Sequence, residues 1–333
     1  MTTRMASLLA AVVLVVGARV VDGQLWSAPT PQRALTLVHG RLVTVDDGPV
    51  GGMRAWIDWG RSVDTIVFDS LGRFATLPEP FAADSITLVV QPTDSGRYYP
   101  VRARLAVDRI AHTLDVLLVP RVWRIDGGRF AGVEIPIDVD AVLRRGSDRG
   151  SFGRVKGKQL VGWTDGSFPV PVVLRHDAGL PISAADSAAF WSAVRAVEQS
   201  LGGPFFLPAG DTLLRGTIYP IDVRIDPRID ADAKTWVSWN RDGQIFEGVI
   251  SFRTHAQLRS EAVVAHELLH VLGFGHTAAW PSTLSPRLIS GGGVTATDVA
   301  YAQLLLRAQA LERRRAMVGG FTASSPSREA GPR

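Results

Sequence analysis

The sequence predicts two globular domains of different classes, a small all-β sandwich followed by an α+β domain. Residues 33–120 consist of short runs rich in Val, Ile, Leu and Thr that are separated by turn-forming residues, which is typical of an all-β sandwich. From residue 165 onward, similar runs alternate with long capped helical patterns. A chain of 333 residues is long enough to bury a hydrophobic core in each of two domains.

The composition is that of an ordinary globular protein and excludes two classes. The formal net charge is only +4, and acidic residues occur throughout the chain. The one dense basic run, Arg313-Arg314-Arg315, falls at the end of a predicted helix, where cations interact favourably with the helix dipole. Nucleic-acid binding is therefore not expected. The absence of cysteine excludes a disulfide framework, so stability has to come from core burial and bound metal.

The first 23 residues are predicted to be a secretory signal peptide. Arg4 precedes an apolar run over residues 6–16, and small residues follow it. This run is shorter than the roughly 20 residues that a membrane-spanning helix needs. We therefore expect a secreted or periplasmic protein, with no stable membrane insertion after signal cleavage.

The sandwich over residues 33–120 is punctuated by turn sequences such as Asp46-Asp47-Gly48-Pro49 and Asp94-Ser95-Gly96. Between these turns the residues are mostly β-branched, aliphatic or aromatic, which favours strands. The strands are expected at Leu35 to Val45, Met53 to Trp59, Thr65 to Phe68, Ile86 to Gln91 and Thr113 to Val119.

Residues 121–164 are predicted to be a linker or extension between the domains. A Gly-rich polar stretch over residues 146–159 lacks apolar periodicity, which indicates an exposed loop. Val133 to Val139 is the only strand expected there. Domains usually separate in such stretches, because few contacts cross them.

The α+β domain is expected over residues 165–318. Its first long helix should begin after Ser183, where Ser183 and Asp186 have the spacing of a capping box, and end at Gly202-Gly203. A last helix should begin at Thr295 to Asp298, and residues 319–333 should be a disordered tail. Strands are expected at Pro171 to Arg175, Thr217 to Ile225, Trp236 to Trp239 and Gln244 to Phe252, and a helix at Ala256 to Leu272.

The residues from His266 to His276 read H-E-x-x-H-x-x-G-x-x-H, and this pattern predicts a zinc site. Residues four apart lie on one face of a helix, so His266 and His270 should point at a common spot. Gly273 should then end the helix in a left-handed conformation and let His276 supply a third nitrogen. Three imidazoles with one open position are the ligands of a catalytic Zn²⁺.

Glu267 stands beside the first ligand, where its carboxylate can take the proton of a water held by the metal. The competing interpretation is a helix with incidental histidines. The full pattern would arise by chance with a probability on the order of 10⁻⁵, which favours the zinc site.

These residues resemble the zinc signature of the metzincin clan of peptidases. Trp280-Pro281-Ser282-Thr283-Leu284-Ser285-Pro286 is similar to the clan's Met-turn, with Leu284 where the family has methionine. Leucine has a similar volume, so an apolar floor beneath the metal can survive the exchange. The resemblance implies a matrixin-like catalytic domain over residues 165–318 and a zinc-dependent protease that acts on protein or peptide substrates.

The same resemblance implies a substrate-binding edge strand at Gly248, Val249 and Ile250. An edge strand exposes unpaired backbone groups, which can bind an extended peptide. The alternative is an ordinary interior strand, and the residues alone do not separate the two.

The N-terminal domain resembles carboxypeptidase regulatory-like domains of the transthyretin type. The resemblance lies in a central hairpin at Asp69 to Phe74 and a closing strand at Asp115 to Pro120. It implies an accessory domain without catalytic residues. An inhibitory propeptide that blocks the zinc with a carboxylate is the alternative, and we favour the accessory domain.

The expected function is therefore an exported zinc endopeptidase with His266, His270 and His276 as ligands and Glu267 as general base. Two alternatives remain open. One is a zinc hydrolase that acts on a non-peptide amide or ester. The other is a non-catalytic binding protein with structural zinc, although a structural site does not need Glu267.

Overall fold

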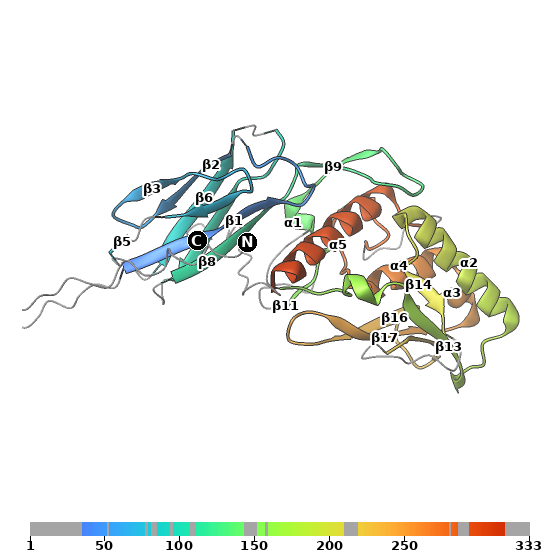
Figure 1. The fold of residues 1–333 in the computed structure, drawn as a ribbon. Helices are drawn as coiled ribbons and strands as arrows, with labels where there is room; N and C mark the ends of the chain where they lie inside the picture. The colour runs from blue at the N-terminus through green and yellow to red at the C-terminus, as the bar shows by residue number, and fades with distance from the viewer. Residues whose placement is uncertain are drawn as a thin grey trace, which may run out of the picture. The chain divides into compact units, whose positions relative to one another are not determined.

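The computed structural model describes residues 35–316, apart from residue 52 and residues 77–78, 81–84, 94–95, 107–110, 143–151, 157–158, 210–218, 280 and 286–292. The predicted signal peptide and the predicted C-terminal tail lie outside the described residues. The described residues between 35 and 316 form a mixed α/β structure, with many strands and few helices (Figure 1). The described buried side chains form two hydrophobic cores, one for each predicted domain.

The first core lies between two sheets of a β-sandwich. In one sheet β1 pairs with β4, β5 and, in parallel, with β8; the other sheet has the order β3-β2-β6-β7. Alternate residues of β6, including Ile86, Leu88 and Val90, are buried, as expected for a strand with one face on a core. The strands are β1 (Leu35–Thr44), β2 (Met53–Asp58), β3 (Val63–Ile66), β4 (Arg73–Ala75), β5 (Glu79–Pro80), β6 (Ser85–Pro92), β7 (Val101–Ala106) and β8 (Ala111–Leu118).

The predicted central hairpin at Asp69 to Phe74 is wrong. Strand β3 pairs with β2, whereas β4 pairs with β1 in the other sheet. The Asp69–Gly72 turn therefore connects the two sheets. Its backbone is held by the Asp69 carboxylate, which accepts hydrogen bonds from the Leu71 and Arg73 amides at 2.8 Å each.

Residues 121–164, expected to be a linker or extension, contribute to the second core, so they are an extension of that domain. Trp123, Phe152, Val161 and Trp163 are at most 2% exposed and belong to that core. The sequence suggests a linker because the Gly-rich polar stretch over residues 146–159 has no apolar periodicity, although Phe152 within it is buried. The elements here are β9 (Val122–Arg124), β10 (Glu134–Pro136), α1 (Val139–Val142), β11 (Val155–Lys156), β12 (Gln159–Leu160) and the short 3₁₀ helix η1 (Asp165–Ser167).

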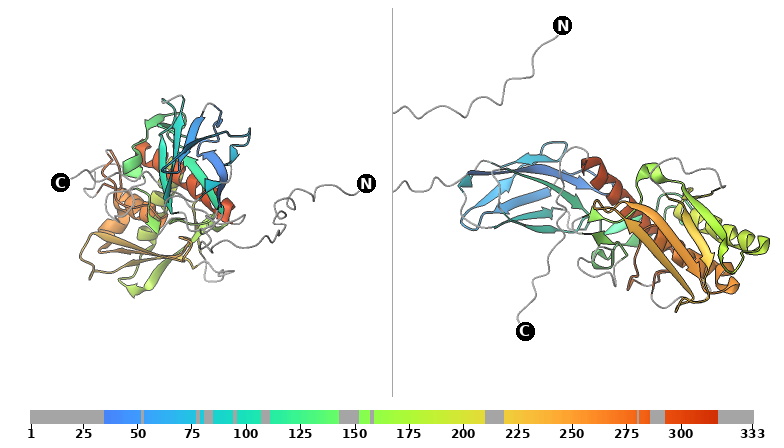
Figure 2. Two further views of the ribbon diagram at one scale, coloured as in Figure 1. Left: turned by 90° about the vertical axis from the view of Figure 1, so that its left-hand side faces the viewer. Right: turned by 90° about the horizontal axis from the view of Figure 1, so that it is seen from below.

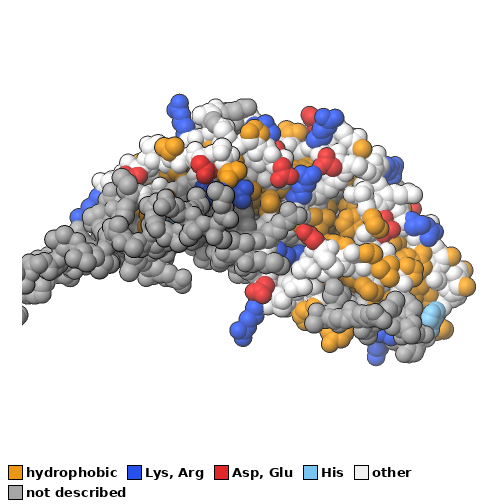
Figure 3. Space-filling view, in the orientation of Figure 1, with side chains coloured by type: hydrophobic (Ala, Val, Ile, Leu, Met, Phe, Trp, Pro, Cys, Tyr) orange, Lys and Arg blue, Asp and Glu red, His pale blue; other side chains and the backbone are white. Residues whose placement is uncertain are grey.

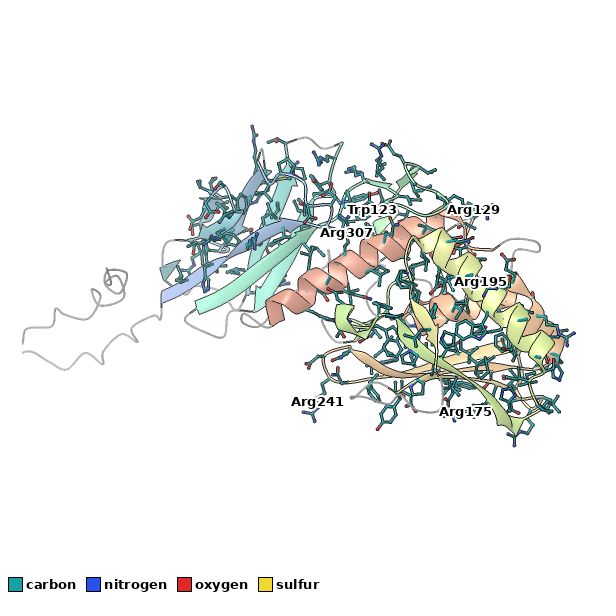
Figure 4. The ribbon with its side chains drawn as sticks, turned by 45° about the vertical axis from the view of Figure 1, so that its right-hand side comes forward. Trp123, Arg129, Arg175, Arg195, Arg241 and Arg307 are labelled. Carbon is teal, nitrogen blue, oxygen red and sulfur yellow. The ribbon has the colours of Figure 1, made fainter. Side chains whose placement is uncertain are left out.

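Residues 123–126, at the start of this segment, are hydrogen-bonded to α5 (Ala296–Ala316), the last described helix. The Gln303 side chain accepts from Trp123 Nε1 at 3.2 Å and donates to the Asp126 carbonyl at 2.6 Å. The Arg307 guanidinium lies 5.4 Å from the centre of the Trp123 ring, and the two side chains are seen together in Figure 4. The second domain therefore begins near residue 121.

A shortened chain that begins at Gly162 is expected not to fold, because it lacks Trp123, Phe152 and Val161 from the core. Loss of even one large buried side chain typically costs about 3–5 kcal/mol, which is comparable to the whole stability of many domains. A chain that begins at Arg121 keeps these side chains and is expected to be soluble. Circular dichroism and a cooperative thermal transition distinguish the two. A cooperative transition in the shorter chain would contradict the boundary near residue 121.

The second domain contains a five-stranded sheet with the order β14-β13-β15-β17-β16. All pairs are parallel except β16 with β17, which are antiparallel. Helices α2 and α4 lie on one side of this sheet (Figure 1), and a view from below shows its strands side by side (Figure 2). The elements are β13 (Val170–Gly179), α2 (Ala184–Leu201), β14 (Phe206–Pro208), β15 (Ile221–Ile225), β16 (Ala233–Trp239), β17 (Ile245–Phe252), α3 (His255–Arg259) and α4 (Glu261–Val271).

Helix α2 forms as its sequence predicts. Ser183 accepts from the Asp186 amide and the Asp186 carboxylate accepts from the Ser183 amide, which completes the capping box. The helix ends at Gly202, whose φ of 87° is a left-handed conformation that other residues rarely adopt. Its buried stripe includes Phe190, Val194 and Val197. This stripe fixes α2 against the sheet and α4.

The helix expected over Ala256 to Leu272 is two helices. Thr254 caps α3, and Ser260 then adopts an extended conformation before α4 begins at Glu261. The sequence has no Gly or Pro at this break, so nothing in its pattern indicates it. None of the described helices is long and apolar enough to cross a membrane.

Candidate metal site

Helix α4 carries the first two histidines of the motif. Every residue from Val264 to Val271 is buried, so His266 and His270 sit inside the domain rather than on its surface. Helical spacing places the two rings on one face, with centroids 4.5 Å apart.

Gly273 turns the chain back toward the helix. Its φ is 102°, and a Cβ at this position would lie 2.9 Å from the Val161 carbonyl oxygen. Both the conformation and the close approach therefore require glycine. After this turn His276 joins the other two histidines, as the sequence predicts, and it is the exposed member of the group.

The three Nε2 atoms converge. The distances are 3.0 Å between His266 and His270, 3.2 Å between His270 and His276, and 3.3 Å between His276 and His266. Ligand nitrogens at 2.0–2.1 Å from a tetrahedral zinc are about 3.3–3.4 Å apart. The histidine group can therefore hold a metal ion.

Backbone carbonyls fix the direction in which two of the rings face. His266 Nδ1 lies 2.7 Å from the Thr283 carbonyl oxygen, and His270 Nδ1 lies 2.8 Å from that of Phe274. A carbonyl oxygen accepts only, so in both rings Nδ1 carries the proton and the Nε2 lone pair faces the centre. Lone pairs that face one another without a proton between them repel, and a cation at the centre removes this repulsion.

The surroundings keep the ligand imidazoles neutral. Burial and the neighbouring His266 hold the pKa of His270 well below its usual range. Burial also lowers the pKa values of His266 and His276, and the positive charge of Arg154 adds to the effect at His276. Neutral imidazole is the form that binds metal, so the site is prepared for a cation.

Glu267 is buried beside the ligands at 5% exposure. Burial raises the pKa of its carboxyl to about 7, although a hydrogen bond from Thr235 acts in the opposite direction. The Thr235 hydroxyl oxygen is 2.6 Å from Glu267 Oε2. A carboxyl whose pKa lies near neutrality can both take up and release a proton.

A buried turn at residues 281–285 supports the first ligand. The Asp298 carboxylate accepts from the Ser282 hydroxyl at 2.5 Å and from the Thr283 amide at 2.9 Å. It also accepts from the Thr295 amide at 2.9 Å, which caps α5. Because the Thr283 carbonyl orients His266, this carboxylate connects the last helix to the metal ligand.

Leu284 lies in the same turn and is fully buried. We expect Leu284→Met to be tolerated, because the two side chains differ little in volume and such exchanges cost under about 1.5 kcal/mol. The melting temperature and the zinc affinity, measured by competition with a chromogenic chelator, should stay close to those of the wild type. A tenfold loss of zinc affinity would show that the candidate metal site depends on leucine at this position. Leu284→Ala, which opens a cavity, is the destabilising control.

The predicted substrate strand is not an edge strand. Gly248, Val249 and Ile250 pair with β15 on one side and with β16 on the other, so their backbone groups are used inside the sheet. A Cβ on Gly248 would meet the Val271 side chain of α4 at 2.7 Å, which explains the glycine by packing. The edge beside the histidines is β16, because it pairs only with β17 among the described strands.

The predicted convergence of His266, His270 and His276 is confirmed, but the sequence does not indicate the residues that orient these rings and Glu267. Thr235 lies 32 residues before Glu267, and no spacing rule connects them. The sequence predicts Asp298 only as a helix cap, and its contact with the turn at residues 281–285 depends on the fold. Arg154 lies in a stretch that the sequence indicates to be a loop.

The described surface on the face in Figure 3 carries basic and acidic side chains scattered among one another. Exposed large apolar side chains include Trp236 of β16, at 44% exposure, and Tyr219. Trp236 also contacts Lys234, whose ammonium lies 5.3 Å from the ring centre. Among the described strands, β16 therefore presents an exposed aromatic ring and one side that pairs with no other strand.

Comparisons with known proteins identify no family for this chain. No family model and no curated protein matches it. Among solved structures, the Bacillus anthracis TIE protein aligns with a TM-score of 0.21 and 7% sequence identity. The alignment covers 27% of this chain and 17% of that chain, so it spans less than a fifth of that protein. A likeness of this size carries no argument about the fold or the function of this chain.

Proposed function

We propose that this protein is an exported zinc-dependent endopeptidase with a metzincin-like catalytic domain. The observation that carries the proposal is the convergence of three histidine Nε2 atoms next to a buried glutamate on the same helix. A structural zinc site is closed by a fourth protein ligand, whereas three histidines with an open position are typical of catalytic zinc. No fourth His, Cys, Asp or Glu joins the group among the described residues.

In the proposed reaction the three histidines and Glu267 have different roles. His266, His270 and His276 would hold the ion through Nε2. Zinc held there would supply Lewis acidity to the scissile carbonyl and to the attacking water. Glu267 takes the proton from that water as its oxygen bonds to the carbonyl carbon, and later delivers it to the leaving nitrogen as the C–N bond breaks. Glu267 thus takes up one proton and gives up one proton in each reaction cycle.

An extended peptide would bind along β16. Among the described strands, β16 pairs only with β17, so the backbone groups on its other side are available to a further strand. Thr235 in the middle of β16 contacts Glu267 directly, so a peptide on this edge passes close to the general base. This arrangement favours a peptide bond as the substrate over a small amide or ester, which has no strand to add.

The proposal is tested with the purified chain, its metal content and casein as an unstructured substrate. We expect one zinc per chain, cleavage of casein at internal bonds, loss of activity with a chelator and recovery when zinc is added back. Mass spectrometry of the fragments identifies internal cleavage. Zinc binding without hydrolysis of casein or of a peptide library would overturn the proposal. Hydrolysis of small esters alone would indicate the non-peptide hydrolase instead.

A further inference from the structure

Thr235 makes the closest side-chain contact to the Glu267 carboxylate among the hydrogen bonds of the described residues, 2.6 Å from Oγ1 to Oε2. The same hydroxyl is 3.3 Å from the Glu267 backbone oxygen. A hydroxyl has one proton, so the shorter contact is the bond it makes. A distance of 2.6 Å is in the range of hydrogen bonds to an ionised carboxylate, which are about twice as strong as neutral ones.

The donor is held rigidly. Thr235 pairs with Ile250 in the middle of the β16–β17 ladder, so its backbone cannot move independently of the sheet. Its neighbours on the same face of β16, Ala233 and Val237, pack against the core that contains α4. Threonine is also branched at Cβ, which restricts χ1.

The acceptor would otherwise be free to rotate. A glutamate side chain has three rotatable bonds, and its terminal carboxylate turns easily about χ3. Because Glu267 is buried, bulk water does not compete for Oε2. The hydroxyl therefore fixes the plane of the carboxylate and occupies one of its two oxygens.

We propose that Thr235 is a positioning residue that holds Glu267 Oε2, so that Oε1 is the oxygen that takes up and delivers the proton. This inference rests on the proposed peptidase function for its kinetic consequence, but the contact itself is independent of catalysis. Positioning matters because a displacement of about 1 Å at a reacting group can cost about 10²-fold in rate. The strand that would bind the peptide backbone would then also orient the general base, so one rigid element sets the distance between them.

The kinetic test compares two substitutions that differ by the hydroxyl. Thr235→Val keeps the shape and removes the donor, and Thr235→Ser keeps the donor and removes the methyl group. We expect Thr235→Val to lower kcat for a peptide substrate by about 10- to 100-fold with KM within threefold, since orientation of the base affects the chemical step. Thr235→Ser keeps the donor, so its kcat should stay within threefold of the wild-type value.

The control is Thr44→Val in the sandwich. Thr44 is a buried threonine whose hydroxyl donates to the Gly48 carbonyl at 2.7 Å, far along the chain from the histidines. It should lower stability slightly and leave kcat and KM unchanged. Zinc content is measured for every variant, because a positioning role leaves the ion in place.

A second measurement does not use activity. In metal-free protein, urea unfolding of the wild type, Thr235→Val, Glu267→Ala and the double variant forms a double-mutant cycle. We expect Thr235→Val to reduce the folding equilibrium constant by about tenfold when Glu267 is present and by less than twofold when it is alanine. Such non-additivity shows that the hydroxyl acts through the carboxylate.

The outcomes separate the two proposals. Equal loss of kcat in the Val and Ser variants, an unchanged kcat in Thr235→Val, or additive unfolding effects would overturn the positioning role. A wild type that cleaves no peptide would overturn the proposed function, and the unfolding cycle would still decide whether Thr235 holds Glu267.

Discussion

Replacing Glu267 with glutamine is expected to abolish peptide hydrolysis while the fold and the zinc remain. The amide has nearly the same shape and can still accept a hydrogen bond from Thr235, but it cannot take a proton from the attacking water. Removal of a general base typically costs about 10²–10⁴-fold in rate. The measurement is kcat for a fluorogenic peptide, together with zinc content and the melting temperature.

Glu261→Gln is the matched control for this substitution. Glu261 begins the same helix, and its side chain is exposed, away from the buried ligands. It should keep activity and zinc content. If Glu267→Gln retained activity within threefold of the wild type, another group would have to be the base. A zinc-free Glu267→Gln protein would instead assign Glu267 to metal binding.

Asp298→Ala is expected to have the largest effect on the integrity of the site. The substitution leaves the Ser282 hydroxyl and the Thr283 and Thr295 amides without their acceptor in a fully buried position. Each unsatisfied buried donor costs about 1–3 kcal/mol, so the free energy of unfolding should fall by roughly 3 kcal/mol or more. Because the Thr283 carbonyl no longer fixes His266, zinc affinity should fall by about 10- to 100-fold.

Asp186→Ala tests whether the loss of zinc affinity is specific. Asp186 is also fully buried and also closes a capping box, at the start of α2. It accepts from Arg259 at 2.6 Å and contacts His255, so its loss should destabilise the fold comparably. It does not contact the turn at residues 281–285 in the described structure. Equal loss of zinc affinity in both variants would refute a specific connection between Asp298 and His266.

The features predicted correctly from the sequence are those whose determining residues lie close together along the chain. His266, Glu267, His270 and His276 fall within eleven residues, so helical geometry and one glycine turn bring them together. The start and end of α2 follow from Ser183, Asp186 and Gly202 for the same reason. Local rules decide such features before any tertiary contact is known.

The wrong predictions concern pairing between distant segments. The strand of Gly248 to Ile250 reads equally well as an interior or an edge strand, and only its neighbours β15 and β16 distinguish the two. Residues 121–164 read as a linker or extension because the polar stretch over residues 146–159 lacks apolar periodicity, yet Trp123, Phe152 and Trp163 are buried. Their burial depends on packing against α5 and the sheet of the second domain. Trp123, for example, contacts Gln303 of α5, which lies 180 residues further along the chain. The periodicity of apolar residues in a sequence does not show which distant segments pack against each other.

Helix α5 affects the order in which the candidate metal site forms during folding. The histidine motif ends at residue 276, but the carboxylate that secures its first ligand is Asp298, and α5 continues to Ala316. The same helix fastens Trp123 through Gln303, over a separation of 180 residues. Contacts between such distant residues form late, because a long loop has to close first. A growing polypeptide would thus contain all three histidines before it could hold His266 in place, and we expect a metal ion to bind tightly only after α5 has packed.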